Sequence, residues 1–401
     1  MTASNKVSNP NAGNWPLPSA GFIIFLPWLT LPGCVRVDRF RFCPLQITEI
    51  ESIVGRDIAP TVEKVLKCYV GKSGQPVKSC TIVLRARHPH AWNIPRNHWD
   101  LVAQATKTLA LACLAEQRFF EGHFSPHLNS TMFRIIGQGV EAGSDRISPF
   151  FPRRGGGLQI GGMRYKDIQF QRPAQIEGTE CHVVNQHLIK AIAKARRSNC
   201  SIIPALELSL DTFLLAHAET SELDWKTCVL LSAIAFEQIL EPAIPNAQAV
   251  AAAFTDCWAA FARRTIAKAK RIKPDSKYVE AQKNWPIHRK WMKELYEARS
   301  SIVHRGPKSE FSQNWTDWQH LVIAAFTYPL IVKLRLAKEG LYGLSDREIG
   351  ACEALDELLD SSWGKGWRNP PEWPTILGLA EGHRELQTTI ARALESKAKD
   401  S

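Results

Sequence analysis

Apolar and polar residues alternate in several short stretches of the first half of the chain. The run GFIIFLPWLTLP, which begins at Gly21, is almost entirely apolar, whereas VRVDRFRF, TVEKVLKCYV and CTIVLRARH alternate and are rich in β-branched residues. These patterns predict one buried strand and several half-buried strands. Between Asp100 and Arg118 the apolar spacing becomes that of a helix. We therefore expect an α+β domain over residues 19–175, preceded by a disordered lead-in over residues 1–18 that is rich in Asn, Ser, Pro and Gly.

After about residue 181 the apolar positions recur every three or four residues, as they do on the buried face of a helix. This spacing predicts helices over residues 183–198, 202–219, 223–240, 246–272, 286–305, 313–338 and 346–360. Ser345 opens the sequence SDRE, which has the spacing of a capping box, and Pro329 predicts a kink. We expect an all-α domain over residues 181–340, followed by C-terminal helices and a tail over residues 341–401.

The composition indicates a folded protein with a basic surface. Hydrophobic residues make up 45% of the chain and charged residues 22%, as in globular proteins. The 50 Lys and Arg exceed the 39 Asp and Glu, and the net charge is +11. This charge favours a polyanionic partner, nucleic acid before an acidic membrane, although many basic proteins are merely soluble.

The cysteines and the first apolar run indicate whether the chain binds a metal, which redox compartment it occupies and whether it crosses a membrane. The ten cysteines are scattered without a C-x-x-C pair, so we expect no structural zinc site and no metal or other cofactor. Most of them lie in apolar stretches, which favours reduced thiols in a reducing cytosol. The run from Gly21 is interrupted by Pro27 and Pro32 and is too short to cross a bilayer. We predict a cytoplasmic protein without a membrane partner.

One short pattern carries candidate chemistry, an Arg followed five residues later by a His. About one match is expected by chance, so the spacing alone identifies no site. Three pairs match, namely Arg85 with His90, Arg118 with His123, and Arg299 with His304. Only the third pair lies within a predicted helix, and context therefore selects it.

The helix that carries the third pair has a defined apolar side. With about 100° per residue, its apolar positions group together, namely Trp291, Leu295, Ala298 and Ile302. Counted from Arg299, Ser300 lies at about 100° and His304 at about 140°, away from that stripe. This arrangement suits a groove that a second helix completes.

The segment LYEARSSIVHRG, which begins at Leu295, resembles the signature helix of HEPN-domain proteins, in particular of the abortive-infection (Apea-like) branch. The upstream segment VLLSAIAFEQILE is similar to an earlier helix of that branch, and the resemblance covers roughly residues 183–340. It implies a HEPN-like helical bundle that forms a homodimer. Family members often carry Asn or Asp after the Arg, where this chain has Ser300.

The resemblance implies a metal-independent endoribonuclease with Arg299 and His304 as catalytic residues and with a role in bacterial antiphage defence or toxin-like RNA degradation. An Arg suits the scissile phosphate, and a His that titrates near neutral pH suits proton transfer. We expect Ser300, Tyr296 and Glu237 to support the pair. For Glu237 this means orienting Arg299 or His304, the alternative being a Glu that reaches solvent.

The densest basic run, ARRTIAKAKRIKP, is expected on the 246–272 helix and its exit, where it would contact RNA or form a solvated face. Its candidate RNA-binding residues are Arg263, Arg264, Lys268, Lys270 and Arg271. Two other interpretations remain open. In the first, the chain is a non-catalytic HEPN-type module for RNA binding or dimerisation. In the second, Arg299 pairs with a carboxylate and His304 caps the C-terminus of its helix.

Overall fold

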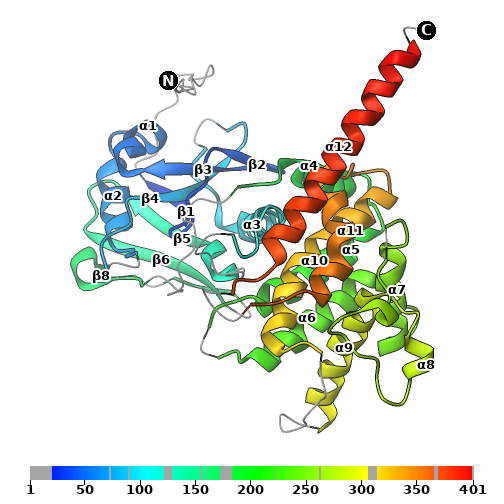
Figure 1. Cartoon of the computed structure of the whole chain (residues 1–401). Helices are drawn as coiled ribbons and strands as arrows, with labels where there is room; N and C mark the ends of the chain where they lie inside the picture. Colours follow the sequence, from blue (N-terminus) through cyan, green and yellow to red (C-terminus); the bar gives the residue numbers. More distant parts are fainter. Residues whose placement is uncertain are drawn as a thin grey trace. The chain divides into compact units, whose positions relative to one another are not determined.

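The computed structural model of the chain divides into two compact units (Figure 1). It describes residues 20–71, 74–88, 91–121, 129–153, 156–159, 161–171, 183–220, 222–261, 263–305, 314–364 and 369–399. The first unit comprises Met1–Thr108, Thr131–Gln175 and Thr179–Val183, and the second comprises Leu109–Ser130, Ile176–Gly178 and Val184–Ser401. The expected disordered lead-in over residues 1–18 lies outside the described residues.

An antiparallel sheet forms the first unit, with strand order β2-β3-β4-β1-β5-β6-β7 and β8 paired to β6. The strands are β1 (Ala20–Leu26), β2 (Val35–Val37), β3 (Phe40–Gln46), β4 (Ser79–Arg85), β5 (Ile136–Glu141), β6 (Arg146–Arg153), β7 (Gly156–Gln159) and β8 (Met163–Arg164). The apolar run from Gly21 is the buried strand β1, as predicted, and β1 pairs with both β4 and β5. An α+β unit followed by helices is the predicted fold class.

One predicted strand of this unit is a helix. The segment TVEKVLKCYV lies mostly in α2 (Ala59–Lys67), which follows α1 (Ile50–Val54). Its buried residues include Val62, Val65 and Leu66, spaced three and one apart as on one helix face. Pro60 in the first turn also favours a helix. The helical spacing of the buried residues therefore decided the structure of this segment, although its β-branched residues favour a strand.

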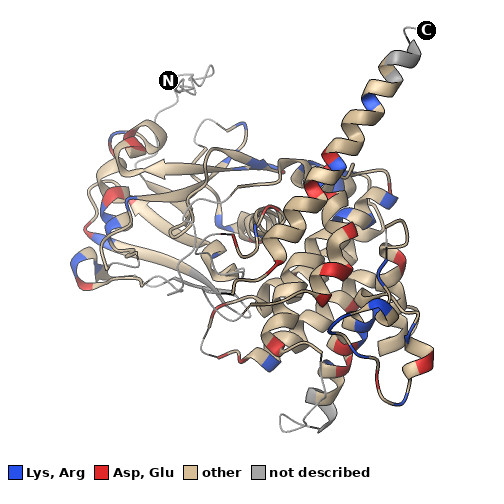
Figure 2. Ribbon diagram, in the orientation of Figure 1, with Lys and Arg blue, Asp and Glu red and all other residues tan. Residues whose placement is uncertain are grey.

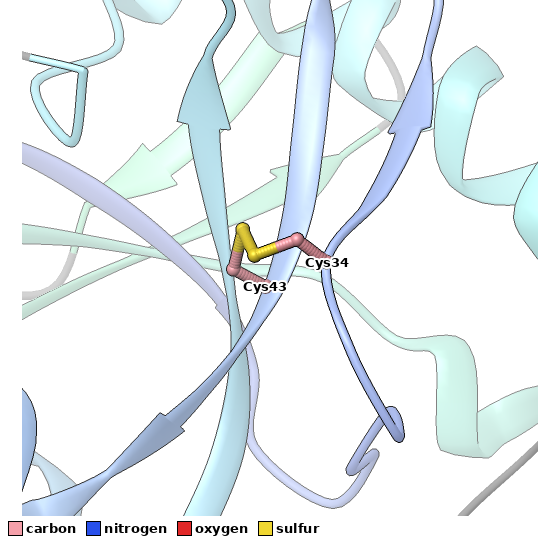
Figure 3. The surroundings of a disulfide bond; sticks show 2 residues. All are labelled: Cys34 and Cys43. Atoms are coloured by element: carbon pink, nitrogen blue, oxygen red, sulfur yellow. A yellow bond between two sulfur atoms is a disulfide. The ribbon is translucent and has the colours of Figure 1, made fainter. Parts of the chain in front are cut away.

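The hairpin of β2 and β3 carries a disulfide between Cys34 and Cys43 (Figure 3). Val35 pairs with Phe42, so the two cysteines are the next opposed positions, with Cα atoms 4.1 Å apart. The expectation of reduced thiols is wrong for this pair, because strand pairing brings together side chains that are nine residues apart in sequence.

The second unit is all helical. Its helices are α4 (Gln186–Arg197), α5 (Ile202–Ala216), α6 (Trp225–Leu240), α7 (Ala247–Cys257), α8 (Val279–Gln282), α9 (Ile287–Arg305), α10 (Asp317–Lys338), α11 (Asp346–Asp360) and α12 (Trp373–Lys399). Helix α10 is long and apolar enough to cross a membrane, but most of it is buried within the protein, where it packs against α4, α5, α6, α7 and α11 (Figure 1). The predicted capping box at Ser345 opens α11.

The unit boundaries differ from the expected domain boundaries at two places. Helix α3 (Trp99–Leu114) runs across the division, and residues 109–130 belong to the helical unit. There Phe120 lies against Trp318, Trp363 and Trp373, with ring centroids 5.5 to 6.1 Å apart. Residues 341–401, which were expected to form C-terminal helices and a tail, belong to the same unit and include the 27-residue helix α12.

The expected helix over residues 246–272 is also too long. Helix α7 ends at Cys257, and the basic run that follows is a loop with a single 3₁₀ turn at Ile266–Lys268. Trp258 is buried after the last turn and donates from Nε1 to the carbonyl oxygen of Cys352 over 3.2 Å. Carboxylates of α11 accept backbone N–H groups of the loop, and these bonds replace the helical ones.

Candidate functional site

Helix α9 carries Arg299 and His304, as predicted from its apolar spacing. The helix is unbroken from Ile287 to Arg305, so the two positions are separated by about 7.5 Å along its axis and about 140° around it. The side chain of His304 lies outside the described part of the structure, as do His90 and His123 of the other two matching pairs. The geometry of the site is therefore built from Arg299.

Tyr296 holds the guanidinium of Arg299 from one turn earlier on α9. Nη1 of Arg299 donates to the phenolic oxygen of Tyr296 over 3.1 Å. Cζ of Arg299 lies 4.9 Å from the centroid of the same ring, which adds a cation–π contact. Tyr296 is itself fixed, because its hydroxyl donates to the carbonyl oxygen of Pro245 over 2.9 Å.

Glu237 of α6 faces the same guanidinium. Its Oε2 atom lies 3.7 Å from Nη2 of Arg299, an ion-pair distance rather than a hydrogen bond. Burial, followed by the neighbouring carboxylate of Glu237, raises the pKa of Tyr296, so the phenol stays neutral. Helices α6 and α9 are kept together beside the pair by an edge-on contact of Phe236 with Trp291, with centroids 5.7 Å apart.

The Arg299 side chain remains 29% exposed, so part of the guanidinium is accessible. Its Nε atom is buried and has no hydrogen-bond partner among the described residues. A planar cation that is held on two sides and open on a third can accept an anionic group at the open side. Ser300, the next residue of α9, is half-buried. The structure thus brings Glu237, Tyr296 and Arg299 together.

The predicted RNA-binding residues lie elsewhere in the helical unit, on the loop between α7 and α8 (Figure 2). Arg263, Lys268, Lys270 and Arg271 are exposed, and Arg264 is half-buried with Nη1 3.7 Å from Oδ2 of Asp360. The prediction that these residues lie on the 246–272 helix and its exit was wrong for the helix, because α7 ends at Cys257. All five residues do lie in the one loop that follows α7. In the described part of the chain, the side chain of Arg299 forms its hydrogen bond with Tyr296 and its ion pair with Glu237, and neither partner belongs to this loop.

A buried charged cluster on the first half of α9 was missed by sequence reasoning. Lys290 and Glu294 are each 2% exposed, and Nζ of Lys290 donates to Asp275 and lies 3.8 Å from Glu294. Glu294 also accepts the backbone N–H of Asn314 over 2.6 Å. Burial raises the pKa of Glu294 to about 7 against the lowering effect of Asn314 and Lys290. Burial also lowers the pKa of His320, 3.9 Å away, to about 3.

Sequence reasoning also missed Asp356 and Asp360, which anchor the basic loop from α11. An available signal was their spacing, because two carboxylates four residues apart fall on the same helix face as the buried Cys352 and Leu359. Asp356 and Asp360 are each 3% exposed. A buried carboxylate needs hydrogen-bond donors, so the spacing predicts that Asp356 and Asp360 have partners. It does not predict that these partners are backbone N–H groups of the basic loop.

The described residues contain no group of three or more His, Cys, Asp or Glu side chains arranged to hold a metal ion. Comparison with known proteins found no matching family model, no similar protein among curated sequences and no similar solved structure. The HEPN resemblance therefore stays a prediction that rests on the residues of α6 and α9.

Proposed function

We propose that this chain is an endoribonuclease that cleaves RNA without a metal ion, with Arg299 and His304 as its catalytic residues. The observation that supports the proposal is the partly exposed guanidinium of Arg299, held by Tyr296 and Glu237 on the helix that also carries His304. A fixed guanidinium suits phosphate because its parallel N–H donors match two phosphate oxygens.

In this reaction the 2′-oxygen of a ribose attacks the adjacent phosphorus, and the bond from phosphorus to the 5′-oxygen of the next nucleotide breaks. His304 takes the proton of the 2′-hydroxyl and returns a proton to the departing 5′-oxygen. Arg299 stabilises the negative charge that develops on the non-bridging oxygens. The products end in a 2′,3′-cyclic phosphate and a 5′-hydroxyl, so DNA is not a substrate.

Two copies of the chain form the site in this proposal. Because Arg299 and His304 lie about 140° apart around α9, one phosphate meets both residues more readily when each comes from a different copy of the helix. The proposed enzyme is thus a cytoplasmic homodimer. Its role in antiphage defence or as a toxin-like nuclease follows from the HEPN resemblance.

RNA binding without cleavage is the second candidate function. A specific observation favours it: Arg299 is already paired with Glu237, as a structural ion pair between α6 and α9 would be. The exposed cations of the loop between α7 and α8 would then account for binding without any reacting residue.

The test is incubation of end-labelled total RNA, in EDTA, with the wild-type chain and the His304→Ala and Arg299→Lys variants. We expect fragments with cyclic phosphate ends from the wild type only. Arg299→Lys keeps the charge but loses the planar fork, and should slow cleavage at least about 100-fold. His383→Ala, which alters an exposed histidine of α12, is the matched control and should cleave normally.

Cleavage that persists in His304→Ala would contradict the proposed catalytic pair. RNA that is bound but not cut by any of the proteins would favour the binding module instead.

A further inference from the structure

The loop between α7 and α8 is strongly cationic and irregular in backbone. Residues 263–274 contain six Lys and Arg and no Asp or Glu. Except for Arg264, these cationic side chains are exposed. Blue stretches of the ribbon mark Lys and Arg along this loop (Figure 2). The apolar residues Ile266 and Ile272 are buried beneath the loop, 4% and 7% exposed. The loop therefore has a fixed inner side and a charged outer side.

The carboxylate of Asp360 organises the second half of this loop. Its oxygens accept three successive backbone N–H groups, those of Lys270 over 2.8 Å, Arg271 over 2.7 Å and Ile272 over 3.4 Å. Consecutive N–H groups that converge on one anion form a nest. Because Asp360 fills this nest from within the protein, the backbone donors point inward and the side chains of Lys270 and Arg271 are left at the surface.

Asp356, one turn earlier on α11, anchors the start of the loop. Its Oδ2 atom accepts the backbone N–H of Arg264 over 2.8 Å, and its Oδ1 atom accepts that of His288 over 2.7 Å. Oδ1 also lies 2.9 Å from Nδ1 of His288. At the far end, Oδ1 of Asn314 accepts the N–H of Lys273 over 2.9 Å. Both ends of the loop are thus tied to the helical core.

Aromatic side chains adjoin the same loop. The N–H of Ile266 donates to the carbonyl oxygen of Trp285 over 3.0 Å, which places Trp285 beside the 3₁₀ turn. The guanidinium of Arg289 lies over the Trp285 ring, 4.4 Å from its centroid, and Tyr278, the last residue of the loop before α8, is 55% exposed. Cations with a partly exposed indole and an exposed phenol beside them suit a single strand of nucleic acid, whose phosphates and bases bind these two kinds of group.

We propose that this loop is a preformed binding surface for the phosphate backbone of single-stranded RNA, and that Asp356 and Asp360 are positioning residues that hold its shape. The choice of RNA as the polyanion rests on the proposed function. A loop that is ordered before binding loses less conformational entropy when it binds than a free loop would. The two buried carboxylates thereby strengthen binding of an anion that they would otherwise repel.

The variant Asp360→Asn distinguishes the effect of the loop conformation on RNA binding from the effect of net charge. The change removes one negative charge from a chain of net charge +11, so long-range electrostatics alone would tighten RNA binding. If Asp360 positions the loop, binding instead weakens, by roughly tenfold or more. Glu357→Gln is the matched control, because Glu357 lies on the same helix, is exposed, and its substitution makes the same change in charge.

The probe is a fluorescein-labelled 2′-O-methyl RNA oligonucleotide of mixed sequence, which has no 2′-hydroxyl and so is not cleaved. Its dissociation constant is measured by anisotropy over a series of salt concentrations. Asp360→Asn should bind more weakly than Glu357→Gln at every salt concentration. Equal affinities of these two folded variants, checked by thermal melting, would overturn the positioning role.

A second pair of variants tests the surface without touching the core. Lys268→Ala/Lys270→Ala should weaken binding and lower the slope of log affinity against log salt by roughly 0.7 for each phosphate that the loop no longer neutralises. Lys190→Ala/Lys194→Ala, which removes two exposed cations of α4, should do neither. If both double variants bind alike, or if only binding to anionic lipid vesicles depends on the loop, the proposal is wrong.

Failure of this proposal and failure of the proposed function are distinguishable. A chain that binds the probe through the loop but never cuts RNA retains this inference and loses the nuclease. If the chain cuts RNA while both loop variants bind the probe normally, the nuclease proposal is retained and the loop inference fails.

Discussion

Nη1 of Arg299 donates to the hydroxyl of Tyr296 over 3.1 Å, and that hydroxyl donates in turn to the carbonyl oxygen of Pro245 over 2.9 Å. The chain of bonds connects the guanidinium to backbone outside α9. These bonds fix the direction of the Arg299 side chain. They leave part of the guanidinium accessible, because the side chain is still 29% exposed. A cation positioned in this way needs little reorganisation when charge develops on a bound phosphate.

Tyr296→Phe removes these hydrogen bonds and keeps the ring beneath the guanidinium. We expect the rate of RNA cleavage to fall by about fivefold, because loss of the hydrogen bond that orients Arg299 raises the barrier by about 1 kcal/mol. The measurement is kcat and KM on a labelled oligonucleotide. Tyr165→Phe, at a half-buried tyrosine of the first unit whose hydroxyl has no hydrogen-bond partner among the described residues, is the control and should leave kcat unchanged. An unchanged kcat in Tyr296→Phe would show that Arg299 needs no support from the hydroxyl.

Mixing two inactive variants tests whether each site takes Arg299 and His304 from different copies. In a dimer of Arg299→Ala with His304→Ala, one site then holds both wild-type residues and the other holds neither. After subunit exchange, about a quarter of the wild-type cleavage rate should return, since about half of the dimers are mixed and each has one intact site. No recovery in proteins shown to exchange subunits would place both residues of a site on one copy.

Asp275 should make the helical unit sensitive to acid. Burial alone would raise its pKa, but hydrogen bonds from Lys290, Gln282 and Lys293 outweigh burial and lower the pKa to about 2. The folded pKa lies below the unfolded value of 3.8, so this contribution is present above about pH 4 and is lost as the pH falls toward 2. It amounts to about 2 kcal/mol, because one pKa unit corresponds to about 1.4 kcal/mol.

Urea unfolding at mildly and strongly acidic pH, about 5 and about 2.5, followed by tryptophan fluorescence, checks this expectation. Asp275→Asn should be less stable than the wild type at the higher pH, since it leaves the buried Lys290 short of a partner. It should also lose less stability on acidification. Parallel losses in the two proteins would contradict the role of Asp275.

Reduction of the bond between Cys34 and Cys43 should destabilise the first unit. Cys34 is exposed and therefore open to a reductant, and the bond closes a loop of about ten residues, for which chain entropy predicts about 2 to 3 kcal/mol. Thermal melting with and without dithiothreitol measures the effect. Cys34→Ser should melt at the lower temperature in both conditions, and a melt of the wild type that ignores dithiothreitol would contradict the prediction.

The sequence by itself determined the helical half of the fold well. The expected helices over 286–305 and 346–360 correspond to α9 and α11, because their apolar spacing and the capping box at Ser345 are signals within one element. It also placed Arg299 and His304 on one helix. These features depend on residues that are near one another in the chain.

The tertiary structure decided the features that depend on distant partners. Arg299 meets Glu237 from another helix, and the basic run is a loop because Asp360, about ninety residues later, takes its backbone N–H groups. Cys34 and Cys43 are joined because two strands pair. A periodic pattern tells which side of an element is buried, whereas hydrogen bonds and ion pairs between elements depend on how those buried sides are brought together.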